Sequence, residues 1–365
     1  MGQAKGNRPV LVTGAAGFIG SAFVRMARPS NCPVVSVDAF TYSGLRENLS
    51  DLVDDPEHRL IEGDIRDEAL MRPLLSQYRP DAIVNFAAES HVDRSIDDPR
   101  GFFSTNVDGT FTLLECARRH YRTLSAGEKA RFRFLQVSTD EVFGSAAPGE
   151  QFTEDTPIRP TSPYAASKAA ADLFVGSHYS TYGLPTLVTH CSNNYGPRQF
   201  PEKLIPHMIE RALAEQTLPV YGDGRHARDW LHVDDHCNAI LTVVAKGTPG
   251  QSYGIGSGRA IANLDLVRQL CSILDEARPR ANGRSHQDLI RFVADRPGHD
   301  RRYEMNCTKI AESLDWRPTI PFLEGLRDTV QWYLEHDAWR QVVKERGYRA
   351  SRLGLGAFGS ERISA

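Results

Sequence analysis

The sequence predicts an α/β protein with a doubly wound parallel sheet and a smaller C-terminal α/β lobe. Three observations predict this fold class. Short apolar runs alternate with helix-like segments through the first half of the chain, which is typical of βαβ units. A glycine-rich turn joins the first apolar run to the first helix. After about Asn194 the alternation weakens, and prolines and glycines become frequent.

Each element follows from its local pattern. Strands covered on both faces are apolar along their whole length, and this pattern predicts strands at 10–13, 34–37, 82–86, 132–137 and 186–189. Helix-like segments lie between them at 18–27, 68–77, 102–120 and 163–182, and later at 205–214 and 264–274. We expect residues 1–194 to form the first part and residues 195–365 mainly the second, with some segments returning to the first. Because no flexible linker separates the parts, they should pack around a cleft.

Length, charge and cysteine usage exclude several classes of protein. The chain has 365 residues, and its net charge of −3 argues against nucleic-acid partners. No run reaches the ~20 apolar residues of a membrane span, and residues 1–9 lack the apolar core of a signal peptide. The six cysteines are scattered without a C-x-x-C pair, so we expect reduced thiols and a cytoplasmic location.

The glycine-rich turn predicts a dinucleotide site. Gly14, Gly17 and Gly20 follow a strand and open a helix, where a close backbone approach and free N–H groups suit a pyrophosphate. Asp38 ends the second strand, where a carboxylate accepts hydrogen bonds from ribose hydroxyls and repels a 2′-phosphate. The sequence therefore predicts a Rossmann-like part that binds NAD rather than NADP. Asp64 and Ile65, after the next strand, are compatible with an adenine contact, although Asp64 also fits a simple turn.

Tyr164 and Lys168 lie four residues apart and therefore share one face of a predicted helix. A nearby ammonium lowers the pKa of a phenol, so we expect Tyr164 to remove a proton from a sugar hydroxyl. Such a pair alone is weak support, but Thr139 ends the preceding strand, where its hydroxyl would bind the same oxygen. Asp140 and Glu141 follow at the mouth of the sheet, where one acid and one base side by side suit the removal of water.

With these features the chain resembles the extended short-chain dehydrogenase/reductases, and specifically the dTDP-glucose 4,6-dehydratases. The resemblance runs from Val10 to about Leu355. The motifs that carry it are 87–95 (AAESHVDRS), 139–144 (TDEVFG), 162–168 (SPYAASK), 193–197 (NNYGP), 199–206 (QFPEKLIP) and 295–303 (DRPGHDRRY).

The resemblance implies conversion of dTDP-glucose to dTDP-4-keto-6-deoxy-glucose by internal hydride transfer through a retained NAD and loss of water. Tyr164, Lys168 and Thr139 would act at the C4 hydroxyl, Glu141 would remove the C5 proton, and Asp140 would protonate the departing C6 hydroxyl. The implied cofactor contacts, beyond the glycines, are Phe18, Ile19, Asp38, Asp64, Ile65, Ala87, Ala88, Thr105, Tyr164, Lys168 and Asn194. The implied substrate contacts are Ser90, Thr139, Asn193, Lys203, Leu204, Tyr221, Arg228, Asn263, His299 and Tyr348.

Several alternatives remain open at this point. Pocket shape decides the nucleotide base, so a dehydratase of a UDP-sugar is the nearest competitor. A nucleotide-sugar 4-epimerase would share the glycine turn and the Tyr/Lys pair, but Asp140 and Glu141 argue against it. A non-catalytic NAD-binding protein would not need these acids. Arg228 could instead be a surface arginine paired with Asp229. The histidines lack metal-ligand spacing, so no metal is expected. Relatives are commonly homodimers, and we expect the same here by analogy.

Overall fold

A parallel sheet of seven strands forms the centre of the computed structural model, which describes residues 8–30 and 32–346. The strand order is β10-β6-β5-β4-β1-β2-β3, and every neighbouring pair is parallel. The order reverses at β1, so the predicted doubly wound parallel sheet is confirmed. The strands are β1 (Val10–Thr13), β2 (Val34–Asp38), β3 (His58–Glu62), β4 (Ala82–Asn85), β5 (Arg133–Thr139), β6 (Thr186–Cys191) and β10 (Ser252–Ile255).

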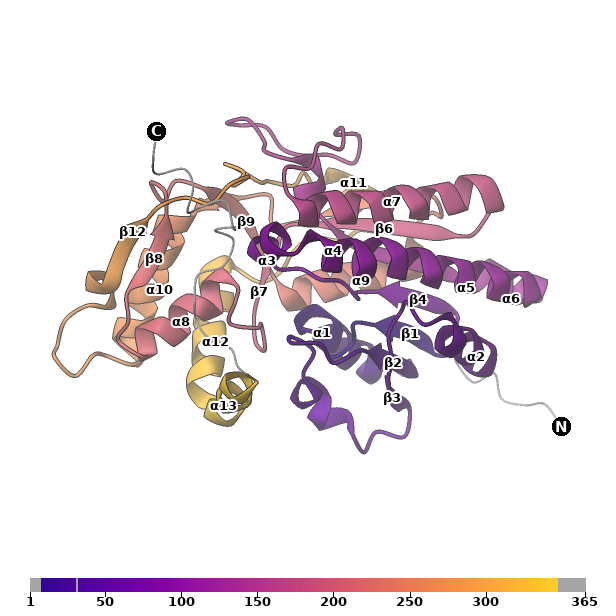
Figure 1. Cartoon of the computed structure of the whole chain (residues 1–365), viewed down its shortest axis with the longest axis horizontal. Helices are drawn as coiled ribbons and strands as arrows, with labels where there is room; N and C mark the ends of the chain where they lie inside the picture. The colour runs from indigo at the N-terminus through magenta and orange to yellow at the C-terminus, as the bar shows by residue number, and fades with distance from the viewer. Residues whose placement is uncertain (1–7, 31, 347–365) are drawn as a thin grey trace.

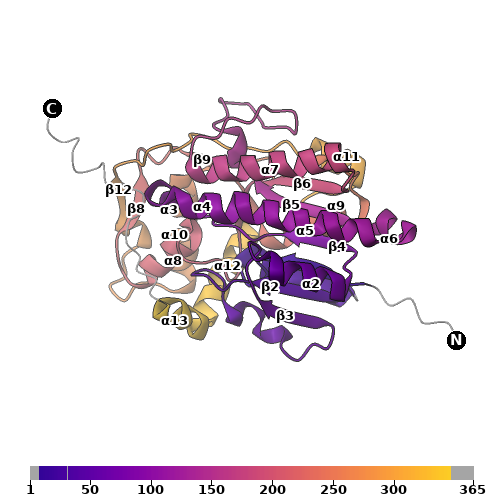
Figure 2. The ribbon, with the colours of Figure 1, turned by 45° about the vertical axis from the view of Figure 1, so that its right-hand side comes forward.

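Helices cover both faces of this sheet (Figures 1 and 2). One layer holds α2 (Glu68–Tyr78), α5 (Thr110–Thr123) and α7 (Pro163–Tyr182), and the other holds α1 (Phe18–Ala27), α9 (Val233–Lys246) and α11 (Thr308–Leu314). Successive residues of a strand point to opposite faces. Leu11 accordingly enters the α2/α5/α7 core, whereas Val10 and Val12 enter the α1/α9/α11 core. Each buried side chain of this size stabilises the fold by about 1.5–3 kcal/mol.

The second half of the chain contributes to both parts of the molecule. Helix α9 packs on α1, and β10 joins the edge of the seven-stranded sheet beside β6, although both follow residue 194. Cys237 and Ile240 of α9 are fully buried in the same core as Val12. Segments of the predicted second part therefore complete the first. The division at residue 194 as a domain boundary stays a prediction.

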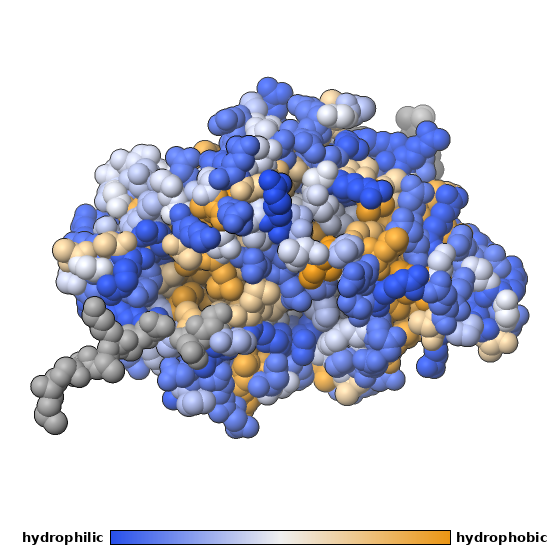
Figure 3. Space-filling model, turned by 180° about the vertical axis from the view of Figure 1, so that it is seen from behind, coloured by the Kyte–Doolittle hydropathy of each residue, from blue (hydrophilic) through white to orange (hydrophobic). Residues whose placement is uncertain are grey.

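The other strands and, apart from α9, the longer helices that follow Cys191 form the smaller lobe, on the left of Figure 1. It contains a three-stranded sheet in the order β11-β9-β7 and a parallel pair, β12 and β8. Its strands are β7 (Asn193–Tyr195), β8 (Leu218–Tyr221), β9 (Ala227–His232), β11 (Ala260–Ala262) and β12 (Ile290–Val293). Its helices are α8 (Leu204–Leu213), α10 (Asn263–Ala277), α12 (Phe322–Glu335) and α13 (Asp337–Glu345). From behind, the surface is mainly hydrophilic with separate apolar patches (Figure 3).

The helix predicted at 102–120 is confirmed, but it is not α-helical throughout. Helix α4 (Pro99–Phe102) leads into a π-helical segment (Phe103–Gly109), which leads into α5. Helix α3 (Val92–Asp97) precedes this stretch, and α6 (Ala126–Arg131) and a 3₁₀ turn (Asp140–Phe143) follow it. In the π-helical segment Asn106 is 1 % exposed. Its side chain accepts from the backbone N–H of Glu89 and donates to the Glu89 carbonyl and to the Ser167 hydroxyl. Periodicity predicted a helix here, but these tertiary contacts to Asn106 accompany a wider turn.

Asp235 holds the chain segment that crosses between the lobes. This carboxylate is 4 % exposed and accepts hydrogen bonds from the Thr319 and Ile320 backbone N–H groups and from the Thr319 hydroxyl.

We expect Asp235→Ala to lower the free energy of unfolding by about 2–4 kcal/mol, because buried donors lose their acceptor. Chemical denaturation measures the effect. Asp234→Ala, at an exposed acid of the same helix turn, is the control. Equal, small effects of the two substitutions would contradict this role for Asp235.

Candidate active site

A cavity of ≈ 500 Å³ opens at the carboxyl edge of the seven-stranded sheet, where ligands bind in doubly wound folds. Every residue predicted to contact the cofactor lines it, and so do the predicted catalytic residues Thr139, Asp140, Glu141, Tyr164 and Lys168. Of the predicted substrate contacts, Ser90, Thr139, Asn193, Lys203 and Leu204 line the cavity. Tyr221, Arg228, Asn263 and His299 do not line it and belong to the smaller lobe; Tyr348 lies outside the described residues.

The glycine turn is shaped for close backbone approach. Gly14 has φ +65°, and a Cβ there would lie 2.6 Å from the backbone nitrogen of Ala87. A Cβ on Gly20 would collide with the Gly14 carbonyl oxygen. Helix α1 begins after Gly17 without a side-chain cap, so its first N–H groups remain available to an anion. This cradle fits the pyrophosphate of a dinucleotide.

Asp38 lies at the other end of the cradle and is 7 % exposed. Its carboxylate accepts from the backbone N–H groups of Ala16 and Phe40, each at 2.8 Å. Burial raises the pKa of Asp38, and these two hydrogen bonds oppose the rise. A carboxylate has about four lone-pair positions, so two remain for ribose hydroxyls. The position therefore fits NAD.

Two predicted cofactor residues already have protein partners. Asp64 forms an ion pair with Arg66 at 2.6 Å. The Asn194 side chain donates to the Ser192 carbonyl and contacts Nδ1 of His236 at 2.7 Å. Both residues line the cavity, but their side chains also brace the loops around it.

Helix α7 brings Tyr164 and Lys168 to the cavity wall. The helix begins with Ser162 as N-cap and Pro163 in the first turn, and both ends are as predicted. The Lys168 ammonium donates to the Val137 carbonyl of β5 at 2.7 Å, which fixes the helix against the strand. Both side chains are buried. The pair therefore lies on one helix face, as its spacing predicted.

The expected lowering of the Tyr164 pKa is wrong for the protein by itself. Burial and the nearby acids Glu141 and Asp140 raise the pKa of Tyr164 well above its usual value, and a hydrogen bond with Thr139 opposes this only in part. Burial also lowers the pKa of Lys168. The sequence argument considered the ammonium but omitted desolvation and the two carboxyl groups.

Asp140 and Glu141 begin the 3₁₀ turn that follows β5, and Thr139 caps this turn by accepting from the Glu141 N–H. Burial, followed by the charge of Glu141, raises the pKa of Asp140 well above its usual value. Burial also raises the pKa of Glu141, but Arg296, Lys203 and Arg228 oppose that rise. One oxygen of Asp140 is buried and has no hydrogen-bond partner among the described residues. The two acids thus have unlike environments, as acid and base roles require.

Cations surround the acids on the smaller-lobe side. Arg228 is 6 % exposed, donates to the Ala227 and Asp300 carbonyls, and lies over the Tyr303 ring at 4.2 Å. The alternative that Arg228 is a surface residue paired with Asp229 is therefore wrong. Lys203 donates to the Ser90 carbonyl. Within the part of the chain that the structure describes, Asn193 and Asn263 each have one buried side-chain oxygen without a partner, which suits ligand donors.

Sequence reasoning missed two groups that support these residues. Asp172, one turn after Lys168 on α7, accepts from the Ser138 hydroxyl at 2.6 Å and lies 3.3 Å from His190, and its charge raises the pKa of Lys168. The same four-residue spacing that revealed Tyr164 and Lys168 would have revealed Asp172. Arg296 donates to Asp93 and opposes the rise in the Glu141 pKa; it lay within a recognised motif without an assigned role.

The fold, the glycine cradle and the Tyr/Lys pair define an NAD-binding enzyme of the extended short-chain dehydrogenase/reductase class. Comparisons with known proteins agree. The family model described as GDP-mannose 4,6 dehydratase matches residues 11–329. A protein of Xanthomonas campestris pv. campestris named dTDP-glucose 4,6-dehydratase is 50 % identical over 94 % of this chain and 98 % of its own length. The chain belongs to the dTDP-glucose 4,6-dehydratase family.

Two further dehydratases support this family assignment, and an epimerase shares the fold. The Escherichia coli (strain K12) protein named dTDP-glucose 4,6-dehydratase 1 is 46 % identical over 93 % of this chain and 97 % of its own length. The structure of DesIV, a dTDP-glucose 4,6-dehydratase from Streptomyces venezuelae with NAD and TYD bound, has 44 % identity and a TM-score of 0.83, covering 92 % of this chain and 99 % of its own. UDP-glucose 4-epimerase from Thermotoga maritima reaches a TM-score of 0.79 at 29 % identity, covering 90 % and 99 %.

Gly14→Ala should prevent cofactor retention, because the new methyl group would collide with the Ala87 backbone at a left-handed φ. Gly127→Ala is the control, since Gly127 lies far from the turn in sequence, in α6, and an added Cβ there would meet nothing within 4 Å. Mass spectrometry of the denatured proteins measures the NAD released per chain. Equal NAD content in the two variants, with unchanged melting temperatures, would rule out the close-approach role of Gly14.

Proposed function

We propose that this protein converts dTDP-glucose to dTDP-4-keto-6-deoxy-glucose with the loss of one water. The observation that carries the proposal is the pairing of Asp140 and Glu141, in unlike environments, beside Tyr164 in one cavity. The names of the relatives, at up to 50 % identity over nearly the whole chain, support the same sugar and nucleotide. In the reaction C4 is oxidised, C6 is reduced and its hydroxyl leaves as water. Bound NAD supplies the reversible acceptor and donor of hydride that this exchange needs.

Each residue has a defined task in this proposal. Tyr164 must first lose its own proton, which burial opposes in the protein by itself. As a phenolate it accepts the proton of the C4 hydroxyl, and the Thr139 hydroxyl orients the same oxygen. Lys168 provides the positive charge that stabilises the phenolate, with Asp172 keeping the buried ammonium charged. Ketone formation at C4 acidifies the proton on C5, which Glu141 removes. Asp140, protonated before this step, gives its proton to the C6 hydroxyl as water departs, and Glu141 returns its proton to C5 as C6 is reduced. The proton taken from the C4 hydroxyl restores the acid form of Asp140.

The cations of the smaller lobe supply the diphosphate contacts. Arg228 presents a guanidinium that binds phosphate oxygens through charge-assisted hydrogen bonds. Asn193 and Asn263 orient the ligand through their unpartnered oxygens and their amide groups. The nearest competing function is dehydration of a UDP-sugar. Epimerisation at C4 is disfavoured because it does not need the two acids.

A direct assay tests this function. We expect the purified protein, without added NAD, to convert dTDP-glucose to a product lighter by one water, with the alkali-induced absorbance of a 4-keto sugar. Mass spectrometry follows the product. No product, even with NAD supplied, would overturn the assignment, and turnover of UDP-glucose in place of dTDP-glucose would redirect it to the competing dehydratase.

Glu141→Gln should lower kcat by about 10²–10⁴-fold, because an amide cannot accept the C5 proton. The variant should also lose the exchange of the C5 proton with deuterated solvent, which NMR measures. Asp140→Asn is the matched comparison: it should slow the loss of water but retain the C5 exchange. Retained exchange in Glu141→Gln would assign the base role to another group.

We further propose a homodimer formed through α5 and α7. Apolar side chains on these helices are unusually exposed, including Leu173 at 63 %, Phe111 at 39 % and Tyr182 at 49 %. Phe111 and Phe174 stack edge-on across the two helices at 5.4 Å, so the apolar surface is continuous. A second copy of the chain would bury it.

Leu173→Glu should convert the dimer to a monomer, because a charge placed in an apolar interface is costly to desolvate. Sedimentation equilibrium measures the mass. Leu323→Glu, at a similarly exposed leucine on α12, should leave the dimer intact. A monomeric wild type, or a dimer that survives Leu173→Glu, would contradict the interface.

Location remains a prediction. All six cysteines are free, which suits the reducing cytoplasm that the sequence predicted. Among the described helices, none combines the length and apolar character needed to span a bilayer.

A further inference from the structure

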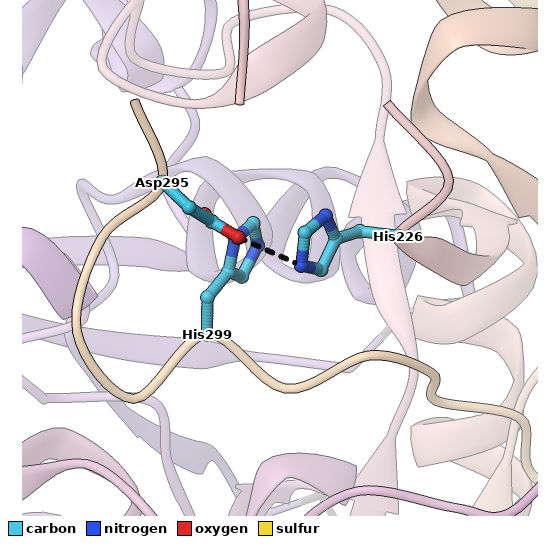
Figure 4. A group of neighbouring side chains, drawn as sticks. All are labelled: His226, Asp295 and His299. Atoms are coloured by element: carbon cyan, nitrogen blue, oxygen red, sulfur yellow. Dashed lines mark hydrogen bonds and ion pairs between the residues drawn. The ribbon is translucent and has the colours of Figure 1, made fainter. Parts of the chain in front are cut away.

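Three side chains of the smaller lobe form a compact group that the proposed reaction leaves unexplained (Figure 4). His226 precedes β9, and Asp295 and His299 lie in the loop that follows β12. Nδ1 of His299 lies 2.6 Å from Asp295, and Nε2 of His226 lies 3.1 Å from the other oxygen of the same carboxylate. The two imidazole rings stack at 3.8 Å with an interplanar angle of 10°.

The shared carboxylate fixes the tautomers of both rings. Although burial opposes it, hydrogen bonds from His299 and from the Arg296 backbone lower the pKa of Asp295. An ionised carboxylate only accepts hydrogen bonds, so Nδ1 of His299 and Nε2 of His226 must each carry a hydrogen. Nε2 of His299 is then a bare nitrogen, and within 8–30 and 32–346 no residue forms a hydrogen bond with it.

The His299 ring is restrained on three sides. His226 covers one face, Asp295 binds Nδ1, and Tyr221 meets the ring edge-on at 5.9 Å and 87°. Restrained polar groups bind a ligand with less loss of conformational entropy. Of these residues, only His226 was absent from both the predicted contacts and the recognised motifs.

The surrounding charges favour an anionic ligand. Burial, followed by Arg296 and Arg228, lowers the pKa of His299 to about 3, so this ring is neutral near pH 7. Burial also lowers the pKa of His226. Asp295 and Asp223 oppose this shift, whereas Arg228 and Arg301 add to it. A diphosphate beside Arg228 and Arg296 would reverse the repulsion and favour a proton on Nε2 of His299, which would then donate to phosphate.

The same three residues could be considered as ligands of a divalent metal, because their donor atoms lie within 4.8 Å of one another. The stacking disfavours that alternative. In parallel rings the nitrogen lone pairs lie in parallel planes, so they do not converge on one ion at the ~2.1 Å of a zinc–imidazole bond.

We propose that His226 is a positioning residue for the substrate diphosphate. It acts by stacking on the His299 ring and so holding it in one orientation, while the shared Asp295 fixes the tautomer of that ring. The proposal rests on the proposed function, since it takes His299 as a substrate contact. His226→Ala should raise KM for dTDP-glucose about tenfold and change kcat less than twofold. His226→Phe, which keeps an aromatic face but not the contact with Asp295, should recover part of the loss in KM.

A double-mutant cycle tests whether His226 acts through His299. His299→Ala should raise KM by itself, and adding His226→Ala to it should raise KM no further. His286→Ala is the matched control, because His286 also pairs with an aspartate, Asp275, in the same lobe but is not part of the group. Additive losses in KM, or a fall in kcat with unchanged KM, would overturn the proposal.

NMR of protein labelled with ¹⁵N in its histidine rings gives a readout independent of turnover. The wild type should show His299 as the Nδ1–H tautomer, and His226→Ala should shift and broaden the His299 ring resonances because the ring loses its stacking partner while it keeps its hydrogen bond with Asp295. Unchanged His299 resonances would overturn the positioning role even if the enzyme is active. Failure of the wild type to act on dTDP-glucose would overturn the proposed function and leave the NMR result to decide the positioning. Stoichiometric Zn²⁺ binding that His226→Ala abolishes would replace the proposal with a metal site.

Discussion

Exclusion of water from the carboxyl edge of the parallel sheet is the constraint on which the site depends. Tyr164, Lys168 and Asp140 are all buried, and burial is the leading cause of the pKa shift of each. The fold tolerates the buried Lys168 because its ammonium binds the Val137 carbonyl and Asp172 supplies a nearby negative charge. In a low-dielectric cavity the remaining charges interact more strongly than they would in water.

The two lobes are joined at the same place. Asp93 of α3 receives hydrogen bonds from Arg296 and Tyr221, while Glu202 receives one from Tyr42. Asp235 anchors the returning segment at Thr319 and Ile320. These polar contacts join residues that are far apart in the sequence. Apolar contacts join the lobes as well, since Leu45 lies in the core of the smaller lobe and Leu231 of β9 lies in the core of the large sheet.

Much of the fold could be predicted from the sequence because buried parallel strands and glycine turns have strong local patterns. The bounds of β1, α1 and α7 follow directly from apolar runs, Pro163 and the glycines. The sequence led us to expect that some later segments return to the first part, but it did not identify β10 as one of them, since the run at 252–255 is short and contains Gly254, a residue type depleted in strands. The residues of the cavity wall were found through motifs. The direction of the Tyr164 pKa shift was not, because it depends on burial and on neighbours brought close only by folding.

The π-helical segment between α4 and α5 has a consequence for the phase of the helix that follows it. A π-helical turn takes up more residues than an α-helical turn, so the side chains of α5 are rotated about the helix axis relative to those of an uninterrupted α-helix. In the phase that the structure shows, Leu113 and Leu114 are fully buried. Loss of a single residue between Phe103 and Gly109 would turn α5 by roughly 100° and carry its apolar stripe out of the sheet interface. The stretch that holds Asn106 against Glu89 is thus also what orients one whole wall of the nucleotide-binding part.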